Sequence, residues 1–456
     1  MKTIWLTAAG AALWFGASPW QESTSESPQL RLPHMIRDTA PTRPESKTPA
    51  APGTPEETGG ATEGTNELVH AVTPKALSNT VRGGLEWLRA NQHEDGGWSQ
   101  GEEAPGMRAH GSQLVLGSNE QTASGPPTNV ADTCVAALAL LRSGSTPAEG
   151  PYATELLKAV GFVCSSVEAA DEESLYVTDV RGTRVQGKIG TYVDTFLASM
   201  FLTEVQDEMP GEKAAERVSA ALRKVLNKIE TNQAQNGGFE GQGWAPVLSQ
   251  GLAGKALNRA SMLGFKVDAE VLASNDAFFV GQADVSADGA AAPGSAGIQL
   301  YGGAAKLGAQ QEAVNNGYRR EREVRDQLAQ TGDADEKKEL VAELDRIVAG
   351  RKAQEESQQA IVNRLGDEGF VAGFGNNGGE EFLSYMNISE SLVVQADDTW
   401  RQWDKRITQN LANVQNEDGS WTGHHCITGR TFCTATALLT LMADRVEVPA
   451  ELLANR

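Results

Sequence analysis

The fold is decided by the stretch from Trp400 to Met442, which reads WRQWDKRITQNLANVQNEDGSWTGHHCITGRTFCTATALLTLM. It begins with a helix-period segment, turns at QNEDGSW (415–421), and passes through a loop with His and Cys into a second apolar helix from about Thr431. Asp-Gly supplies the left-handed residue that ends a helix, the glutamine amide can reach exposed backbone groups, and the tryptophan ring packs over the turn. The stretch therefore predicts a helical hairpin with a fixed corner.

The same corner occurs twice upstream. The motifs are QHEDGGW at 92–98 and QAQNGGF at 233–239, and each lies between a helical segment and another apolar run. A repeated corner predicts a repeated fold. The residues that we expect to build the corners are Gln92, Asp95, Gly96 and Trp98, then Gln233, Gly237 and Phe239, and finally Gln415, Asp418, Gly419 and Trp421.

Helix-period segments pair along the chain into six hairpins, and the second helix of each pair is the more apolar one. A helix that is apolar all round is buried. The pattern therefore predicts an all-α fold, an α/α toroid in which six hairpins form a closed double ring with the second helices inside. An open solenoid is the alternative, but it needs polar caps at both ends. The predicted hairpins are 75–91 with 130–143, 153–168 with 191–206, 213–233 with 246–264, 268–281 with 295–309, 352–365 with 380–395, and 399–414 with 431–443.

The segment 310–360 lies between the fourth and fifth hairpins and is dense in Glu, Arg, Lys and Gln. A turn near 331–333 divides it, and Leu340, Leu344 and Ile347 form a thin apolar seam on its second half. This pattern predicts an inserted, charged, antiparallel two-helix arm of coiled-coil type. The arm is either a solvated excursion or a lid or docking surface for a partner.

The 456-residue chain has a formal net charge of -21, which argues against binding to nucleic acid or to an anionic membrane. Residues 1–20 combine one lysine with a short apolar run and small residues, which is typical of a signal peptide. Pro19 disturbs the cleavage site, so an uncleaved anchor is the alternative. We find no other segment long and apolar enough to span a membrane.

Residues 21–72 are rich in Ser, Thr, Pro, Glu and Gly and poor in large apolar residues, so they predict a disordered tether. The toroid domain is expected over 73–456. The sequence thus predicts an exported protein, periplasmic or secreted, that stays tethered to the membrane if its N-terminus is not cleaved. Four cysteines in such a protein favour a disulfide, and Cys426 with Cys433 is the nearest pair.

The corners and the apolar second helices resemble those of terpenoid cyclases and protein prenyltransferase β subunits, which share an α/α toroid and the Gln-Trp repeat. The resemblance covers about 75–456 apart from the 310–360 arm. It implies a prenyltransferase and squalene cyclase repeat fold, but corner residues are scaffold and leave the reaction open. Thioester domains of macroglobulins use a similar toroid, yet their Gly-Cys-Gly-Glu-Gln segment is absent.

Squalene-type cyclases carry their acid in an Asp-x-Asp-Asp-Thr motif, and the resemblance implies a similar acid here. The nearest matches are QADDT at 395–399 and NVADT at 129–133, and both depart from the pattern. Asp132 of the second match lies where a second helix begins, and Asp194 occupies the same place in the next hairpin. These residues are either catalytic acids or helix caps, and their repetition favours caps.

Prenyltransferase β subunits hold catalytic zinc on an Asp-x-Cys and a histidine, and Asp132 with Cys134 has that form. His424, His425 and Cys426 precede the sixth second helix, which neighbours the first hairpin in a closed ring. The resemblance therefore implies a zinc site built from these five residues, although the spacing of the family is not preserved. The alternative is a loop whose imidazoles hydrogen-bond locally and whose cysteine forms a disulfide.

Two functions follow from these patterns. In the first, the chain has diverged from the catalytic families and binds a hydrophobic small molecule or a protein partner through its cavity or its arm. In the second, it is an isoprenoid-type transferase or a cyclase or lyase. That enzyme would use Asp132, Asp194 and His425 as catalytic residues, with zinc as its cofactor.

Overall fold

The computed structural model describes residues 67–103, 126–281, 295–375, 377–427 and 429–454. The chain divides into two units, Met1–Thr62 and Glu63–Arg456, and the described residues lie in the second. The predicted signal peptide or anchor (1–20) and the predicted tether up to residue 66 lie outside the described residues. Within the described ranges, no helix has the length and apolar character needed to cross a membrane.

The described residues form a mostly helical structure. Helices occupy the segments expected for the first members of the hairpins, namely α1 (Asn79–Ala90), α4 (Ala153–Ala169), α7 (Glu212–Thr231), α9 (Ala269–Val280), α11 (Ala334–Arg364) and α14 (Asp398–Asn413). They also occupy the segments of the second members, namely α3 (Val130–Arg142), α6 (Val193–Val205), α8 (Pro246–Met262), α10 (Ser295–Gln330), α13 (Gly379–Leu392) and α15 (Arg430–Leu441). The shorter helices are α5 (Arg184–Lys188), α12 (Glu368–Ala372) and α16 (Ala450–Ala454), with 3₁₀ turns η1 (Gln206–Glu208), η2 (Val393–Gln395) and η3 (Ala443–Arg445).

Two small antiparallel sheets accompany the helices. β2 (Trp98–Ser99) pairs with β3 (Thr128–Asn129) beside the first corner. β1 (Leu68–His70) pairs with β4 (Glu447–Pro449), so the two ends of the folded chain are hydrogen-bonded to each other. The folded region thus begins within the range expected to be a tether, because a partner strand almost four hundred residues away completes β1.

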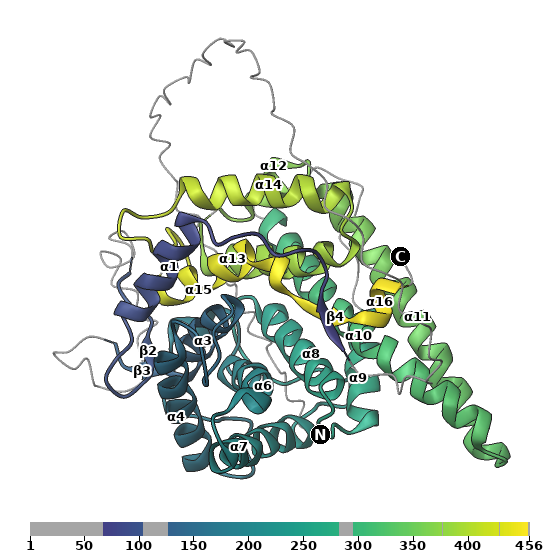
Figure 1. Cartoon of the computed structure of the whole chain (residues 1–456). Coiled ribbons are helices and arrows are strands. Elements are labelled where there is room, and N and C mark those ends of the chain that lie inside the picture. Colours follow the sequence, from purple (N-terminus) through teal and green to yellow (C-terminus); the bar gives the residue numbers. More distant parts are fainter. Residues whose placement is uncertain (1–66, 104–125, 282–294, 376, 428, 455–456) are drawn as a thin grey trace, which may run out of the picture. The chain divides into compact units, whose positions relative to one another are not determined.

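First and second helices differ in how much of their surface is buried. α14 buries a single stripe made by Trp400, Trp403, Ile407 and Leu411. In contrast, every residue of α3 from Val130 to Leu140 is buried, and so is every residue of α15 from Thr431 to Thr440. A helix buried on all sides must be surrounded by other elements. In Figure 1, α3, α6 and α8 accordingly lie inside α4 and α7.

The second helices contact one another in chain order. α3 packs on α6, α6 on α8, α8 on α10, α10 on α13, and α13 on α15. α15 then packs on α3 and also contacts α1. The order of contacts therefore returns from the last hairpin to the first.

Each corner glutamine joins two successive hairpins. Nε2 of Gln92 donates to a carbonyl of its own turn (2.9 Å) and to the carbonyl of Glu155 in α4 (2.8 Å). Nε2 of Gln233 likewise donates within its turn (3.1 Å) and to Val271 in α9 (2.9 Å). The same amide thus closes one hairpin and fixes the first turn of the next.

The last corner makes the corresponding bonds to the first hairpin. Nε2 of Gln415 donates to the carbonyl of Gly419 (2.8 Å) and to the carbonyl of Thr80 in α1 (2.8 Å). Gly419 has a φ of +89°, and a Cβ there would lie 2.6 Å from the carbonyl oxygen of Gly83. Glycine is therefore required both by the left-handed backbone and by the close approach of α1.

The corner tryptophans fix each turn to its own hairpin. Nε1 of Trp421 donates to the carbonyl of Leu411 (2.8 Å), and its backbone N–H donates to Oγ1 of Thr434 in α15 (2.9 Å). Trp98 makes the equivalent bonds to Leu88 and Thr133 at the same distances. Both rings are fully buried. The indole therefore packs in the core while its one polar group is satisfied.

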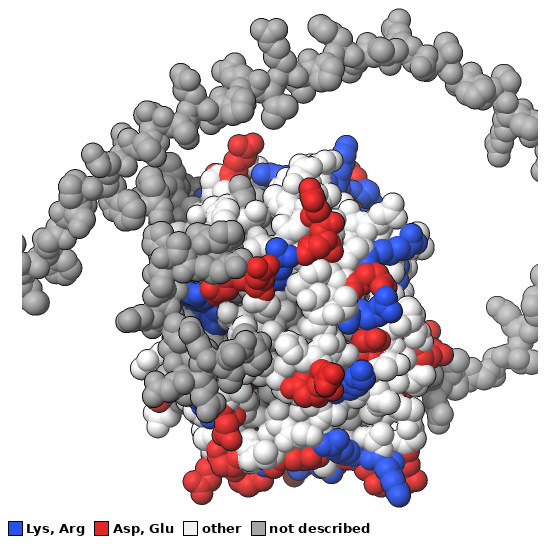
Figure 2. All heavy atoms as spheres, turned by 90° about the vertical axis from the view of Figure 1, so that its left-hand side faces the viewer, with Lys and Arg blue, Asp and Glu red and all other residues white. Residues whose placement is uncertain are grey.

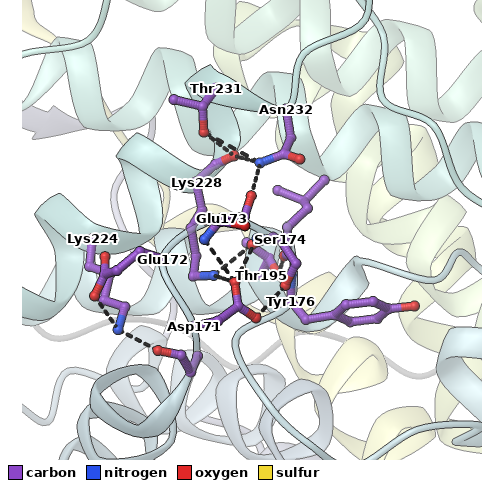
Figure 3. A network of polar contacts seen from close by, with 12 residues as sticks. Asp171, Glu172, Glu173, Ser174, Tyr176, Thr195, Lys224, Lys228, Thr231 and Asn232 are labelled. Carbon is purple, nitrogen blue, oxygen red and sulfur yellow. Dashed lines mark hydrogen bonds and ion pairs between the residues drawn. The ribbon is translucent and has the colours of Figure 1, made fainter.

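A buried lysine holds the connection between α4 and α5 (Figure 3). The Lys228 side chain of α7 is fully buried, and its Nζ donates to the carbonyl of Ser174 (2.6 Å) and lies 3.4 Å from Asp171. On the other side of the connection, Oγ1 of Thr195 in α6 donates to the carbonyl of Leu175 (2.5 Å). The connection is thus tied to a first helix and to a second helix.

The charged arm differs from the prediction in one respect. α10 runs without a break from the core into the arm, and α11 returns from Ala334 to the core, so the arm is an extension of two hairpin helices rather than a separate insertion. The sequence changes composition near residue 310 but carries no proline or cap there, so the helix continues. Asp333 caps α11, and Arg320 pairs with Glu343 across the two helices (2.6 Å).

Charges of both signs are interleaved on the face of the molecule shown in Figure 2. Among the described residues visible there, acidic and basic side chains lie next to each other without a large area of one sign. Such mixed surfaces favour solubility over capture of a polyanion.

We predict that Gln415→Ala lowers the free energy of unfolding by about 1–3 kcal/mol, because two carbonyls at the junction lose their donor. Urea denaturation followed by circular dichroism measures the change. Gln409→Ala is the matched control, since the Gln409 amide donates to exposed Asn413 on the same helix. Equal stability of the two variants would contradict the role assigned to the corner amide.

Candidate functional site

The loop before α15 carries the paired histidines identified from the sequence. Nε2 of His424 lies 2.6 Å from the carbonyl of Gly375, so this nitrogen carries a proton and donates. Nδ1 of His424 lies 3.1 Å from Nδ1 of His425, within hydrogen-bond distance. Nε2 of His425 lies 3.2 Å from Oε2 of Glu381, outside good hydrogen-bond directions but within ion-pair range. His425 therefore lies between the ring of His424 and the carboxylate of Glu381.

Glu381 is a buried carboxylate with several partners. Its Oε1 accepts from the hydroxyl of Tyr301 (2.5 Å) and from the backbone N–H of Phe374 (2.9 Å). Burial alone would raise its pKa, but His425, Tyr301 and the Phe374 N–H lower the pKa below its ordinary value. Burial likewise opposes the charge on His425, yet Glu381 raises the pKa of that imidazole overall. The two groups therefore stabilise each other in their charged forms.

The neighbouring carboxyl, Glu380, has the opposite character. It is fully buried, its Oε2 accepts from the N–H of Ile427 (3.2 Å), and its Oε1 has no hydrogen-bond partner among the described residues. Burial, followed by the charge of Glu381, raises its pKa to about 7. Two adjacent carboxyls with separated pKa values can act as a proton donor and a carboxylate near neutral pH.

Cys426 and Cys433 do not form the expected disulfide, and all four cysteines are free. Cys433 lies on the buried α15 and turns its thiol toward the carbonyl of Ile427 (3.5 Å). Cys426 is half-buried in the preceding loop, where its φ is +53°. Burial raises the pKa of Cys426 to about 11, so it is a thiol rather than a reactive thiolate at neutral pH.

Asp132 does not cap its helix, contrary to the cap interpretation. Asn129 is the N-cap of α3, because its Oδ1 accepts from the Asp132 N–H (2.9 Å) while its Nδ2 donates to Oδ2 of Asp132 (2.7 Å). The other carboxyl oxygen of Asp132 is buried without a partner among the described residues. Burial raises the pKa of Asp132 to about 7.

Asp194 caps a helix, but not its own. Its Oδ1 accepts from the N–H of Ala131 at the start of α3 (3.0 Å), and its Oδ2 accepts from Nε2 of Gln186 in α5 (2.7 Å). Burial raises the pKa of Asp194, with the hydrogen bond of Gln186 opposing that shift. The residue thus links the N-terminal ends of two neighbouring second helices. Asp397 of the other acid-like motif caps α14 by accepting from the Trp400 N–H (2.9 Å).

The residues suggested as zinc ligands do not come together as one ligand set. Among the described residues, no group of three or more His, Cys, Asp and Glu side chains is arranged to hold a metal ion. Cys134 is fully buried, and burial, Asp194 and Cys164 raise the pKa of its thiol. His424 and His425 are instead engaged with Gly375 and Glu381.

A cavity of about 320 Å³ lies at the other end of the second helices. Part of its wall is apolar and comes from Leu138, Leu197, Met200, Leu252 and Met386. Charged side chains also line the cavity, namely Arg142, Glu204, Glu208, Lys255, Arg259, Glu312, Glu390 and Arg445, together with His70 of β1 and Glu447 of β4.

These charges form two networks on the cavity wall. Glu390 of α13 accepts from Nη2 of Arg142 (3.0 Å) and from Nζ of Lys255. Arg259 of α8 pairs with Glu204 of α6 (2.6 Å) and lies 3.8 Å from Glu312 of α10. These residues were not predicted from the sequence. The available signal was the presence of a few charges within otherwise apolar second helices.

No protein-family model matches this chain, and no curated protein is similar to it.

We predict that the fold loses stability as the pH rises through the pKa of Glu380. Its folded-state pKa of about 7 exceeds the ordinary value of 4.5, so its contribution is full below the ordinary pKa and is lost above about pH 7. Glu380→Gln resembles the protonated acid and should be more stable than the parent at about pH 8, by up to roughly 3 kcal/mol. Urea denaturation at about pH 5 and about pH 8 measures how the free energy of unfolding changes with pH.

Glu381→Gln is the control for that experiment. It removes a carboxylate that His425 and Tyr301 stabilise, so it should lower stability at about pH 7 rather than raise it. The prediction is contradicted if the free energy of unfolding of Glu380→Gln changes with pH as much as that of the parent. Ionisation of Glu380 would then not destabilise the folded protein.

Proposed function

We propose that this chain is an α/α toroid whose central cavity binds a small amphiphilic molecule. The cyclic order of contacts among α3, α6, α8, α10, α13 and α15 supports the closed ring. The bonds from Gln415 to α1 support it as well, because they join the last hairpin to the first.

The cavity carries the functional part of the proposal. Its volume of about 320 Å³ falls at the lower end of the range of small-molecule sites, roughly 300–1,000 Å³. Leu138, Leu197 and Leu252 offer apolar contact, while charged side chains offer fixed polar contacts. A ligand with an apolar body and a polar end matches such a wall better than a plain hydrocarbon, which would leave the charges desolvated and without new partners.

The neutral fluorophore N-phenyl-1-naphthylamine tests this proposal. We expect saturable binding to the purified protein with enhanced fluorescence, because the probe enters an apolar environment. Leu138→Trp places a large ring in the cavity and should weaken binding by about tenfold.

Leu157→Trp is the matched control, because Leu157 lies exposed on the outer helix α4. It should leave probe binding unchanged. Thermal denaturation verifies that both variants are folded. Absence of saturable binding, or equal binding by the two tryptophan variants, would contradict a ligand site in the cavity.

A further inference from the structure

Two basic side chains of the cavity wall, Arg142 and Lys255, surround one carboxylate. Glu390 accepts from Arg142 with one oxygen (3.0 Å) and from Lys255 with the other. Lys255 also donates to Oδ1 of Asn387 (3.2 Å). The side chains of Lys255 and Glu390 are only 6% and 12% exposed. The side chain of Arg142 is 23% exposed. Two cations thus share one anionic partner, so this group of three side chains carries one positive charge in surplus.

Arg142 also has an unused donor. Its Nη2 bonds to Glu390, but its Nη1 is buried and has no hydrogen-bond partner among the described residues. Arg142 lines the cavity near the C-terminal end of α3. A buried donor without an acceptor is unfavourable, so an acceptor delivered by a ligand would improve the local structure.

The pKa of Glu390 reflects the positive charges that surround its carboxyl group. Complete burial would raise the pKa of its carboxyl, yet Lys255 and Arg142 lower that pKa to about 2. On the other wall, Arg259 is shared by Glu204 and Glu312, and burial raises the pKa of Glu312. Over the whole lining, acidic side chains outnumber basic ones, with Glu204, Glu208, Glu312, Glu390 and Glu447 against Arg142, Lys255, Arg259 and Arg445. The positive surplus is therefore local to the group formed by Arg142, Lys255 and Glu390.

We propose that the ligand is an amphiphile with one negative charge, a carboxylate of the fatty-acid type, whose head binds Arg142 and Lys255. The one surplus positive charge matches a ligand head group with a single negative charge. A diphosphate carries more negative charge than this wall can neutralise, so it is disfavoured. The chain of the ligand lies along Leu138, Leu197 and Leu252. This inference rests on the proposed function, since it names the class of molecule that the same cavity binds.

Displacement of N-phenyl-1-naphthylamine tests the charge preference. Decanoate, 1-decanol and decyltrimethylammonium have the same chain and differ in the head. We expect decanoate to displace the probe at about one tenth of the 1-decanol concentration, because its head makes charge-assisted hydrogen bonds. The cation should compete least. Equal competition by decanoate and 1-decanol would overturn the inference and leave the proposed function intact, whereas absence of probe binding would overturn both.

Variants test whether the wall made by Arg142 and Lys255 causes the preference for an anionic head group. Arg142→Met should weaken decanoate binding by about ten times more than it weakens 1-decanol binding, because only the carboxylate head uses the charge of Arg142. Arg401→Met is the control, since Arg401 pairs with Asp398 on the outer surface of α14. Glu390→Gln adds to the surplus charge and should tighten decanoate binding. If that variant does not fold, Arg142→Met against Arg401→Met decides alone, and unchanged decanoate binding by Arg142→Met overturns the inference.

Discussion

The structure depends on one side-chain amide that bonds to two backbones at once. Each corner glutamine donates to its own turn and to a carbonyl in the first helix of a neighbouring hairpin. A helix leaves its terminal backbone groups unsatisfied, so a turn without such a partner would open into solvent. Because the amide of Gln415 reaches Thr80, the interaction that spaces neighbouring hairpins also joins the last hairpin to the first.

Several charged side chains of the second helices lie at the helix end that favours their charge. Asp132, Asp194, Glu380 and Glu381 all lie in the first turns of their helices, where the helix dipole favours negative charge. Arg142 and Arg259 lie in the last turns of theirs, where positive charge is favoured. Glu204 and Glu390 also lie in the last turns of α6 and α13, where the helix dipole opposes their charge. Their basic partners, Arg259 for Glu204 and Arg142 and Lys255 for Glu390, offset that effect. The proposed binding function uses the cavity end.

The corners could be predicted because their chemistry is local. Gln415, Gly419 and Trp421 lie within seven residues, and the backbone geometry of Asp-Gly limits what they can do. The turn between α10 and α11 was visible for the same reason. Features that depend on distant partners were not visible. β1 pairs with β4 across the length of the domain, and Asp194 caps a helix that begins sixty residues earlier.

The candidate site was only partly predictable from the sequence. The paired histidines were found because two imidazoles beside a cysteine are conspicuous, but Glu380 and Glu381 belong to α13 and meet them only in the folded protein. The expected disulfide does not form because burial of α15 turns Cys433 toward a backbone carbonyl. Arg142, Lys255 and Glu390 come from three helices, so their convergence depends on how those helices pack.

Carbodiimide cross-linking followed by peptide mass spectrometry tests the junction between the first and last hairpins most directly. Nζ of Lys75, just before α1, forms an ion pair with Asp404 in α14, and the pair is partly exposed. The account predicts an intramolecular amide between these two residues, formed as readily as the one between Lys224 and Glu172, which lie 2.8 Å apart. Cross-linking of Lys224 to Glu172 without any product joining Lys75 to Asp404 would show that the first and last hairpins do not meet.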